Sequence, residues 1–248
     1  MDRWVGKVAL VSGASSGIGN SIARKLAEHG MKVLACDRSK QQVDELTAAV
    51  NGKGELFPYQ CDVKDEKQII GMFDFIRNKF GTIHVCVNTA GQAYKSSILS
   101  GNTEEWRDMF DVNVIGLCIC CRESVKLMRE SGVDDGHVIN INSMSGHRVV
   151  DLHLYAASKF AVTALSEGLR KELNEAKTHI RCTSISPGMV ETQFAPRLNK
   201  DTTGEKDWYS SMKCLQAEDI ADAVLFALQA PSHVNVNEIM IRPTEQAK

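Results

Sequence analysis

The sequence lacks the uninterrupted runs of one residue type that mark membrane proteins and nucleic-acid-binding proteins. Its longest apolar stretch, VIGLCICC, ends at Arg122 and Glu123, whereas a membrane-spanning helix needs about 20 apolar residues. No run of five or more like charges occurs in the 248 residues, and 29 basic against 31 acidic residues give a net charge of −2. We therefore expect neither a membrane span nor a basic surface for nucleic acid.

The sequence also lacks the features of a disulfide-stabilised secreted protein. Its eight cysteines lie mostly within apolar segments, and its first residues, MDRWVGKVALVSG, carry no signal-peptide pattern. Cys118, Cys120 and Cys121 crowd one predicted helix, but no second His or Cys pair at zinc-site spacing follows them, so no metal site is expected. We predict reduced, buried thiols in a cytoplasmic protein.

Short apolar segments alternate along the chain with longer segments of helical periodicity. After the apolar segment KVALVSG, Ile18, Ile22 and Leu26 recur at helical spacing, and Gly30 provides a stop. The same reading predicts strands at 7–13, 32–36, 55–63, 82–91, 137–143, 180–188 and 237–243, and helices at 17–30, 39–50, 64–80, 102–131, 155–176 and 217–229. Strands rich in Val, Ile and Cys are typical of a sheet buried on both faces. We predict an α/β protein with a single Rossmann-type domain over residues 1–248, built on a doubly wound, seven-stranded parallel sheet with helices on both faces.

A glycine-rich turn follows the first predicted strand. Its residues, GASSGIG, place glycines where they allow a tight turn and close approach of the backbone to a ligand. The helix that starts here directs free N–H groups and the positive end of its dipole toward a pyrophosphate. Because the turn lies between a strand and a helix, we favour a dinucleotide site over a plain glycine-rich turn. The predicted contacts are Gly13, Ser15, Ser16, Gly17, Ile18 and Gly19.

The ends of the second and third predicted strands carry further candidates for the cofactor site. Asp37 lies about twenty residues beyond the glycine turn, where a carboxylate accepts hydrogen bonds from the adenosine ribose of NAD. Its neighbour Arg38 could instead hold the 2′-phosphate of NADP, which Asp37 would repel. The pair favours NAD slightly and leaves NADP open. Asp62 and Val63 fit an adenine clamp, with a simple strand-end turn as the alternative.

Ordered motifs along essentially the whole chain make it resemble the short-chain dehydrogenase/reductase family. They are GASSGIG, Asn88-Thr89-Ala90-Gly91, Asn113 in DVNVIG, Ser143 in NINSMSG, Tyr155 and Lys159 in YAASK, and Pro187-Gly188. The resemblance implies a nicotinamide cofactor contacted by Asn88, Ala90, Gly91, Tyr155, Lys159, Pro187, Gly188, Val190 and Thr192. It also implies a homodimer or homotetramer. Thr89 and Ser12 depart from the family pattern, but each keeps a hydroxyl that can bond the local backbone.

A narrower resemblance concerns one branch of that family. Longer stretches, among them DDGHVININSMSGHRV, THIRCTSISPGMVETQFA and the terminal RPTEQ, are similar to the branch that includes animal dehydrogenase/reductase member eleven and the insect farnesol dehydrogenases. This implies the interconversion of alcohols with ketones or aldehydes on lipophilic molecules such as steroids, isoprenoids and retinoids, usually with NADP. Asp37 departs from the branch, in which a small neutral residue tends to precede the arginine.

Tyr155 and Lys159 form the centre of the expected chemistry. Four residues apart on a helix, their side chains project from the same face, although this spacing also occurs by chance in many helices. A lysine cation one turn away is expected to lower the pKa of Tyr155, which then acts as general acid in reduction and as general base in oxidation. Ser143 is expected to donate a hydrogen bond to the substrate oxygen, with Ser145 as a rival donor. The resemblance implies that Asn113 holds a water that relays protons to Lys159, and the alternative is that Asn113 caps a helix bend.

The segment 189–215 loses the apolar periodicity and follows the sixth predicted strand. It is therefore placed to form a substrate-binding lid. We expect Phe194 to contact the substrate, and further candidates for an apolar wall are Leu198, Trp208, Tyr209 and Met212, unless these side chains pack the lid onto the domain. His153 is expected either to line the substrate mouth or to be a solvated loop residue.

These observations lead to one preferred function and to alternatives from other classes. We predict an NAD(P)-dependent oxidoreductase that interconverts an alcohol and a ketone or aldehyde on a lipophilic small molecule. A non-catalytic dinucleotide-binding sensor or assembly protein is the alternative, and the complete set Asn113, Ser143, Tyr155 and Lys159 argues against it, because binding alone needs only the glycine turn. A methyl-donor-binding enzyme would not explain YxxxK, and a serine hydrolase would need a GxSxG turn after a strand.

Overall fold

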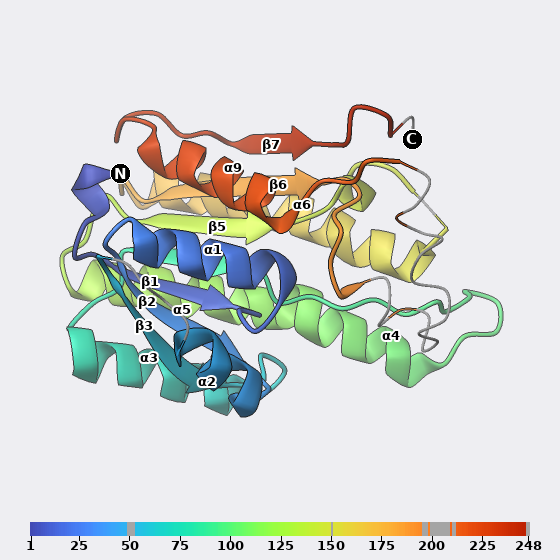
Figure 1. Ribbon diagram of the computed structural model, residues 1–248, viewed down its shortest axis with the longest axis horizontal. Coiled ribbons are helices and arrows are strands. Elements are labelled where there is room, and N and C mark those ends of the chain that lie inside the picture. The colour runs from blue at the N-terminus through green and yellow to red at the C-terminus, as the bar shows by residue number, and fades with distance from the viewer. Residues whose placement is uncertain (49–52, 150, 195–197, 199–208, 210–211, 247–248) are drawn as a thin grey trace.

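A parallel sheet forms the centre of the structure, a computed structural model that describes residues 1–48, 53–149, 151–194, 198, 209 and 212–246. Its seven strands lie in the order β3-β2-β1-β4-β5-β6-β7 (Figure 1). The strands are β1 (Val8–Ser12), β2 (Lys32–Asp37), β3 (Glu55–Gln60), β4 (Val85–Asn88), β5 (His137–Ile141), β6 (Arg181–Pro187) and β7 (Glu238–Ile241). The predicted seven-stranded parallel sheet is therefore confirmed.

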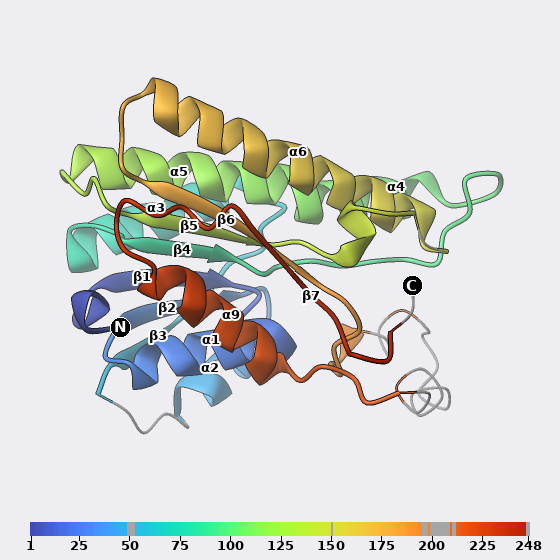
Figure 2. The ribbon, with the colours of Figure 1, turned by 90° about the horizontal axis from the view of Figure 1, so that it is seen from above.

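Helices cover both faces of this sheet (Figure 2). They are α1 (Gly17–Glu28), α2 (Lys40–Ala48), α3 (Glu66–Phe80), α4 (Thr103–Phe110), α5 (Leu117–Glu130), α6 (His153–Glu175) and α9 (Ala217–Gln229), with the short turns η1 (Asp2–Trp4) and η3 (Met144–Gly146). Successive side chains of β1 point to opposite faces. Ala9 and Val11 pack in one core with α1, α2 and α9, whereas Val8 and Leu10 pack in a second core with α3, α5 and α6.

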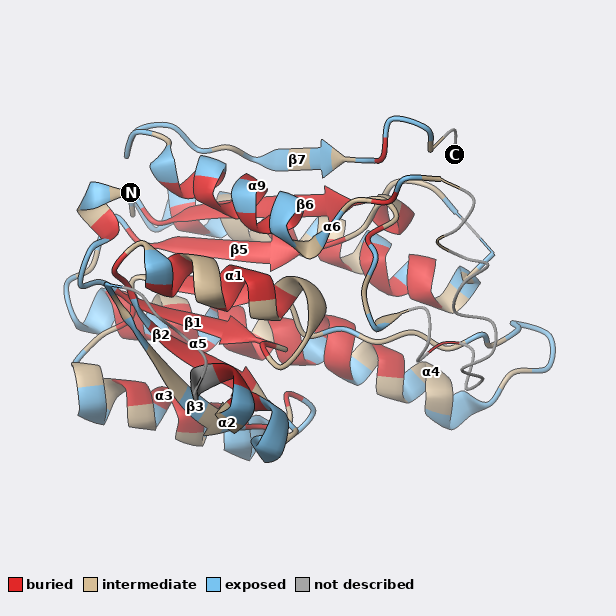
Figure 3. Cartoon of the chain, viewed as in Figure 1, coloured by how far each residue is buried: buried red, intermediate tan, exposed pale blue. Residues whose placement is uncertain are grey.

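The two edge strands differ from the prediction that the strands are buried on both faces. β1, β4, β5 and β6 are buried at every position, but β3 and β7 alternate between exposed and half-buried residues (Figure 3). An edge strand has a neighbouring strand on one side only, and here the covering helices do not extend fully over it. The prediction of complete burial is thus right for the centre of the sheet and wrong for β3 and β7.

A π-helical turn interrupts the helix predicted over residues 102–131. The predicted start is correct, since the Asn102 side chain accepts a hydrogen bond from the backbone N of Glu104 (2.9 Å). Residues Asp111–Gly116 (η2) form the π-helix between α4 and α5. Gly116 lies against the turn that follows β3, where an added Cβ would be 2.4 Å from the carbonyl oxygen of Val63. Asn113 is buried within this turn, and such interruptions often mark functional sites.

The structure also bears on the cysteines, on membrane-spanning helices and on metal sites. Seven of the eight cysteines are buried free thiols and Cys118 is a half-buried one, so burial is confirmed for all but Cys118. No helix in the described part of the chain is long and apolar enough to cross a membrane. Among the same residues, no group of three or more His, Cys, Asp or Glu side chains is placed to hold a metal ion.

Candidate active site

A cavity of about 1380 Å³ lies along the carboxyl ends of the strands. The glycine turn after β1 and the ends of β2 and β3 line one part of it, and segments that follow β4, β5 and β6 line the other. Open parallel sheets bind ligands at this edge, where the strand order reverses between β1 and β4. The predicted contact residues that line the cavity are Gly13, Ser15, Ser16, Gly17, Ile18, Gly19, Asp37, Arg38, Asp62, Val63, Ala90, Gly91, Ser143, His153, Tyr155, Pro187, Gly188, Val190, Thr192 and Phe194.

The glycine turn is packed so closely that side chains would not fit. A Cβ at Gly13 would lie 2.8 Å from Cα of Ala90, and a Cβ at Gly19 would lie 2.2 Å from the carbonyl oxygen of Gly13. Gly13 and Gly17 have φ angles of +64° and +53°, in the left-handed region that favours glycine. The side chain of Ser16, the residue before α1, makes no capping hydrogen bond. The first N–H groups of α1 therefore suit an anionic group such as a pyrophosphate.

Asp37 is fixed at the end of β2 by the glycine turn itself. Its Oδ2 accepts a hydrogen bond from Ser15 Oγ (2.7 Å), and its Oδ1 accepts one from the backbone N of Ser39 (3.0 Å). A carboxylate has about four acceptor positions, so it can still accept a bond from a ribose hydroxyl. Arg38 is exposed beside it and also lines the cavity. Both the acid that suits NAD and the cation that suits NADP are thus present.

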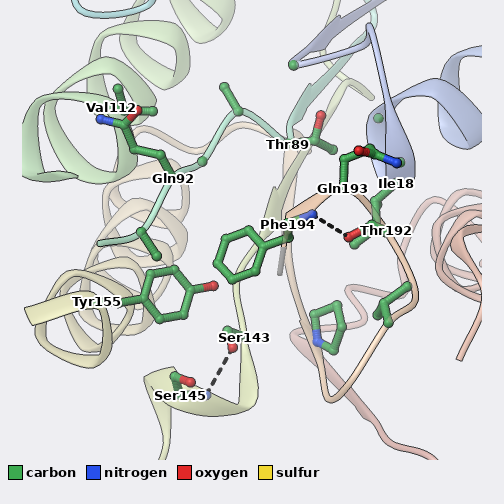
Figure 4. A pocket seen from close by; sticks show the side chains of 18 of the residues that line it. Ile18, Thr89, Gln92, Val112, Ser143, Ser145, Tyr155, Thr192, Gln193 and Phe194 are labelled. Atoms are coloured by element: carbon green, nitrogen blue, oxygen red, sulfur yellow. Dashed lines mark hydrogen bonds between the residues drawn. The ribbon is translucent and has the colours of Figure 1, made fainter. Parts of the chain in front are cut away.

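Tyr155 and Ser143 point into the same part of the cavity (Figure 4). Burial raises the pKa of Tyr155 to about 12, and its hydrogen bond with Ser143 opposes that rise. Ser143 Oγ accepts a hydrogen bond from the backbone N of Ser145 (3.1 Å). Because Ser143 is an acceptor in that bond, its own O–H can be directed at a substrate oxygen. Ser145 therefore orients Ser143, although its own side chain also lines the cavity.

Lys159 lies just behind the cavity lining, where its Nζ would be 3.9 Å from a Cβ at Gly91. Its Nζ donates a hydrogen bond to the carbonyl oxygen of Ile141 (3.0 Å) and lies 5.8 Å from the centre of the Tyr155 ring. Burial lowers the pKa of Lys159 to about 8. The expected lowering of the Tyr155 pKa below its ordinary value is wrong for this structure, because burial disfavours the charged form of both groups.

Asn113 connects the segment after β4 to α6. Its Oδ1 accepts a hydrogen bond from the backbone N of Gln92, and its Nδ2 donates to the carbonyl oxygen of Gln92, both at 2.9 Å. The same Nδ2 donates to Ser158 Oγ (3.0 Å), which in turn donates to the carbonyl oxygen of Tyr155 (2.7 Å). Asn113 thus fixes the segment after β4 relative to α6, although Asn113 itself does not line the cavity.

Asn88 is a second predicted contact that lies outside the cavity lining. It is buried at the end of β4, and its Nδ2 donates to Oδ1 of Asn140 (2.9 Å). Its position inside the sheet explains this placement, since the next residues, not Asn88, turn toward the cavity.

Thr89 and Ser12, the two residues that depart from the family pattern, bond each other. Thr89 N donates to Ser12 Oγ (3.2 Å), and Thr89 Oγ1 donates to the carbonyl oxygen of Ser12. The local bonding expected for these two hydroxyls is confirmed.

The start of the segment 189–215 covers the cavity between the glycine turn and Tyr155. The Phe194 ring packs on the Tyr155 ring, with ring centres 5.5 Å apart (Figure 4). Thr192 Oγ1 accepts a hydrogen bond from the backbone N of Phe194 (3.2 Å), and a Cβ at Gly17 would lie 3.2 Å from the Thr192 side chain. Among the other wall candidates, Tyr209 lines the cavity, Leu198 and Met212 do not, and Trp208 lies outside the described residues.

Comparison with known proteins decides the family. The family model described as short chain dehydrogenase matches residues 7–203. The chain belongs to the short-chain dehydrogenase/reductase family. It is 51% identical to "Dehydrogenase/reductase SDR family member 11" of Homo sapiens over 99% of this chain and 97% of that protein. It is 41% identical to "Farnesol dehydrogenase" of Aedes aegypti over 98% of each. The family and branch that the motifs resemble are both confirmed.

Solved structures of other family members share this architecture. A serine dehydrogenase complexed with NADP+ matches with a TM-score of 0.90 and 31% identity, over 97% of this chain and 96% of that one. An alcohol dehydrogenase from the archaeon Thermococcus sibiricus, complexed with 5-hydroxy-NADP, matches with a TM-score of 0.84 and 26% identity, over 98% of both chains. This chain therefore shares the fold of these structures, and its family binds NAD(P). These similarities do not decide between NAD and NADP.

This short-chain dehydrogenase/reductase also has cavity residues that the sequence motifs did not indicate. Residues 92–97 after β4 form one wall of the cavity, and Gln246 near the end of the chain forms part of another. Gln246 Oε1 accepts a hydrogen bond from the backbone N of Met189 (2.9 Å) at the start of the lid segment. The terminal RPTEQ, which is similar to the branch named above, was the sole hint of a role for this end. Residues 92–97 carry no local pattern that distinguishes them from an ordinary loop.

Proposed function

We propose that this protein is an NAD(P)-dependent alcohol dehydrogenase/carbonyl reductase that acts on lipophilic substrates. The observation that carries the proposal is one continuous cavity that joins a glycine turn suited to a pyrophosphate with the hydroxyls of Ser143 and Tyr155. A carbonyl oxygen placed between these two hydroxyls would have a hydrogen-bond donor and a proton donor at the same atom. This is what reduction of a ketone or an aldehyde to an alcohol requires.

Proton transfer is the step that the side chains perform. A bound nicotinamide would supply hydride to the carbonyl carbon, or take it from the alcohol carbon. Tyr155, whose pKa is about 12, is protonated at neutral pH and donates its proton to the substrate oxygen in reduction. In oxidation Tyr155 must first lose its own proton toward Lys159 and solvent, and its deprotonated oxygen then takes the proton of the alcohol. Ser143 donates a hydrogen bond to the same oxygen and stabilises the negative charge that develops there.

Lys159 and Asn113 support this proton transfer from behind the cavity. Since the pKa of Lys159 is about 8, its ammonium can return a proton to Tyr155 near neutral pH. We propose that a water held near Asn113 connects Lys159 to solvent. The hydrogen bonds from Asn113 to Gln92 and Ser158 keep this region in place.

We propose that the remaining predicted residues each contact a different part of the cofactor. We assign Asp37 or Arg38 to the adenosine ribose, Asp62 and Val63 to the adenine, and the glycine turn to the pyrophosphate. The nicotinamide and its ribose would be contacted by Ala90, Gly91, Tyr155, Pro187, Gly188, Val190 and Thr192, with Lys159 close behind Gly91 and Asn88 supporting this part of the cavity from within the sheet. The bond from Ser15 holds the Asp37 carboxylate in the cavity and favours NAD, whereas exposed Arg38 keeps NADP possible.

The substrate class, location and assembly are proposed from chemistry and from relatives. Phe194 over Tyr155, together with Met189 and Val190 in the cavity lining, suits a lipophilic substrate, such as a hydroxysteroid, an isoprenoid like farnesol, or a retinoid. The exposed His153 lies at the mouth of the same cavity. A relative named farnesol dehydrogenase supports the isoprenoid option. We propose a cytoplasmic homodimer or homotetramer that binds no nucleic acid.

The test is a panel of steroids, retinoids, farnesol and small diketones, followed by nicotinamide absorbance with NAD(H) and NADP(H). We expect Tyr155→Phe to lower turnover at least about a hundredfold, because the general acid is removed, and to leave dinucleotide binding near the wild-type value. Tyr59→Phe, on β3 and away from the cavity, is the matched control and should retain turnover. Unchanged turnover in Tyr155→Phe would overturn the role of Tyr155. If the wild-type protein binds the dinucleotide but turns over no substrate of the panel, the result favours the alternative, a non-catalytic dinucleotide-binding sensor or assembly protein.

A further inference from the structure

The side chain of Asp108 in α4 accepts bonds from three donors that belong to two segments, the loop after β4 and the turn after β3. Its Oδ2 accepts hydrogen bonds from Tyr94 Oη and from Gln92 Nε2, both at 2.5 Å, and its Oδ1 pairs with Lys64 Nζ at 2.7 Å. The backbone oxygen of Asp108 also accepts a bond from Gln92 Nε2 (2.8 Å). Gln92 and Tyr94 line the cavity, but Asp108 does not. The carboxylate therefore acts on the cavity through its neighbours.

The bonds to Asp108 fix the orientation of the Gln92 side chain. Both hydrogens of its Nε2 are directed at oxygens of Asp108, so the amide cannot flip without placing Oε1 against a carboxylate. The backbone of Gln92 is held independently by Asn113, which bonds both its N and its O. Two residues therefore hold Gln92. Asn113, in η2, bonds its main chain, and Asp108, in α4, bonds its side chain.

The rest of the wall is held in the same way. Trp106, on the same helix, donates from Nε1 to Ser96 Oγ (2.9 Å). The segment 92–97 is therefore attached to α4 at its start, at Tyr94 and near its end. Lys64, which pairs with Asp108, directly follows Asp62 and Val63, which also line the cavity. Asp108 joins the turn beside the proposed adenine site to the wall beside the reacting hydroxyls.

The ionised state of Asp108 fits this arrangement. Burial opposes ionisation, but bonds from Lys64, Tyr94 and Gln92 outweigh it and lower the pKa of Asp108. The bond to this carboxylate, with burial, raises the pKa of Tyr94 to about 12, so Tyr94 remains a donor. Hydrogen bonds to a charged acceptor are stronger than hydrogen bonds between neutral groups. Three donors on one carboxylate therefore hold this region more firmly than three separate neutral bonds would.

We propose that Asp108 is a positioning residue that sets the substrate wall formed by residues 92–97 and so determines the affinity for the carbonyl substrate. This rests on the proposed function, in which the glycine turn holds the cofactor and the carbonyl lies at Ser143 and Tyr155; the inference adds residues 92–97, which line the same cavity, to the substrate side. The wall contributes to binding, whereas hydride and proton transfer take place at groups that Asp108 does not contact. Loss of the carboxylate should therefore change KM for the substrate much more than kcat.

The first experiment compares Asp108→Asn with wild type on a substrate that wild type turns over. Asparagine keeps the shape, but its amide group would oppose Lys64 or Tyr94 as a second donor. We expect KM for the carbonyl substrate to rise about five- to tenfold, the scale of the net contribution of one ordinary hydrogen bond, because Asp108 acts on the substrate only through the wall. We expect kcat and the dissociation constant of NAD(P) to stay within about twofold, as for interactions that bind without acting on the transition state. Glu104→Gln, which removes an exposed ion pair with Arg107 on the same helix, is the control and should match wild type.

Further measurements separate positioning from general stability. In the cofactor-free protein, tryptic cleavage after exposed Lys95 in the wall should be faster in Asp108→Asn than in Glu104→Gln, which requires no turnover. Tyr94→Phe should raise KM less than Asp108→Asn, and the double variant should be no worse than Asp108→Asn alone, because both act through one carboxylate. Tyr94→Phe alone carries the test if Asp108→Asn does not fold.

Two results would overturn the inference. One is faster cleavage after Lys95 with an unchanged KM, which would make Asp108 purely structural. The other is a fall in kcat with an unchanged KM. If wild type turns over no substrate of the panel, the proposed function fails first, and that outcome is distinct from an active wild type whose KM is insensitive to Asp108.

Discussion

Asp37 is the residue at which the two candidate cofactors would be distinguished. Its carboxylate is held by Ser15 and Ser39, so it cannot easily turn away from a 2′-phosphate in the cavity. We expect Asp37→Ala to raise the ratio of kcat/KM with NADP to kcat/KM with NAD about tenfold, equivalent to removing about 1.4 kcal/mol of repulsion. The measurement is initial rates with both cofactors. Asp44→Ala, which removes an exposed acid paired with Lys40, is the control. An unchanged ratio, or a wild type that already prefers NADP tenfold, would show that Arg38 dominates.

Single residues also show where sequence reasoning succeeds and where it stops. Gly13 and Gly17 were predictable, because a turn between a strand and a helix that must bind an anion requires their backbone freedom. The state of Lys159 was not predictable. Its spacing from Tyr155 correctly placed both on one helix, but its pKa depends on burial against Ile141, which lies far away in the chain. Asp108 is an extreme case, since in the sequence it is one more acidic residue on a polar helix face.

At the scale of elements, the start of α3 offers a test of capping. Asp65 is exposed, and its Oδ1 accepts hydrogen bonds from the backbone N of Lys67 (2.9 Å) and of Gln68 (3.4 Å). We expect Asp65→Ala to lower the free energy of unfolding by about 1 kcal/mol, the usual value of an N-cap side chain. Asp65→Asn retains an acceptor at the same place and should lose much less. Urea unfolding followed by circular dichroism measures both. Equal losses in the two variants would show that the charge, and not the cap, matters.

Elements were predicted well where periodicity was continuous and less well where packing overrides it. Each predicted strand and helix is present at its predicted place because apolar spacing and buried faces agree. The π-helical turn at Asp111–Gly116 was not predicted, since the apolar pattern of the sequence runs through it without a break. The turn coincides with a tertiary contact, the close approach of Gly116 to Val63, which the sequence does not show. The half-exposed state of β3 and β7 was likewise missed, because strand order is not visible in the sequence.

At the scale of the whole molecule, the half-buried His84 and the buried His137 predict how stability depends on pH. Burial, with a contribution from nearby Lys7, lowers the pKa of His84 to about 4, and its Nδ1 accepts a hydrogen bond from the backbone N of Val8 (3.2 Å). Burial lowers the pKa of His137 as well. Below about pH 6.5 the unfolded chain binds more protons than the folded one, so the free energy of unfolding falls from pH 6.5 toward pH 4.

The pH dependence can be measured by urea unfolding at pH 7 and pH 5. We expect the folded state to lose about 1 kcal/mol through His84 over this interval, a value reduced for its partial exposure. His84→Gln, which keeps an acceptor for Val8, should decrease the difference between the two pH values. His233→Gln, at an exposed position, should leave the difference as in wild type. A difference that is the same in all three proteins would contradict the assignment to His84.

The position of the cavity at one edge of the sheet has a consequence for divergence within the family. The serine dehydrogenase differs from this chain at about two positions in three, yet the two architectures superpose with a TM-score of 0.90. The strands and the inner helix faces are constrained by the two cores, but the segments that follow β4, β5 and β6 are constrained mainly by what they bind. Substitutions there can accumulate without unfolding the protein. A lineage can thus exchange one substrate for another by gradual change in a few loops while inheriting the same scaffold.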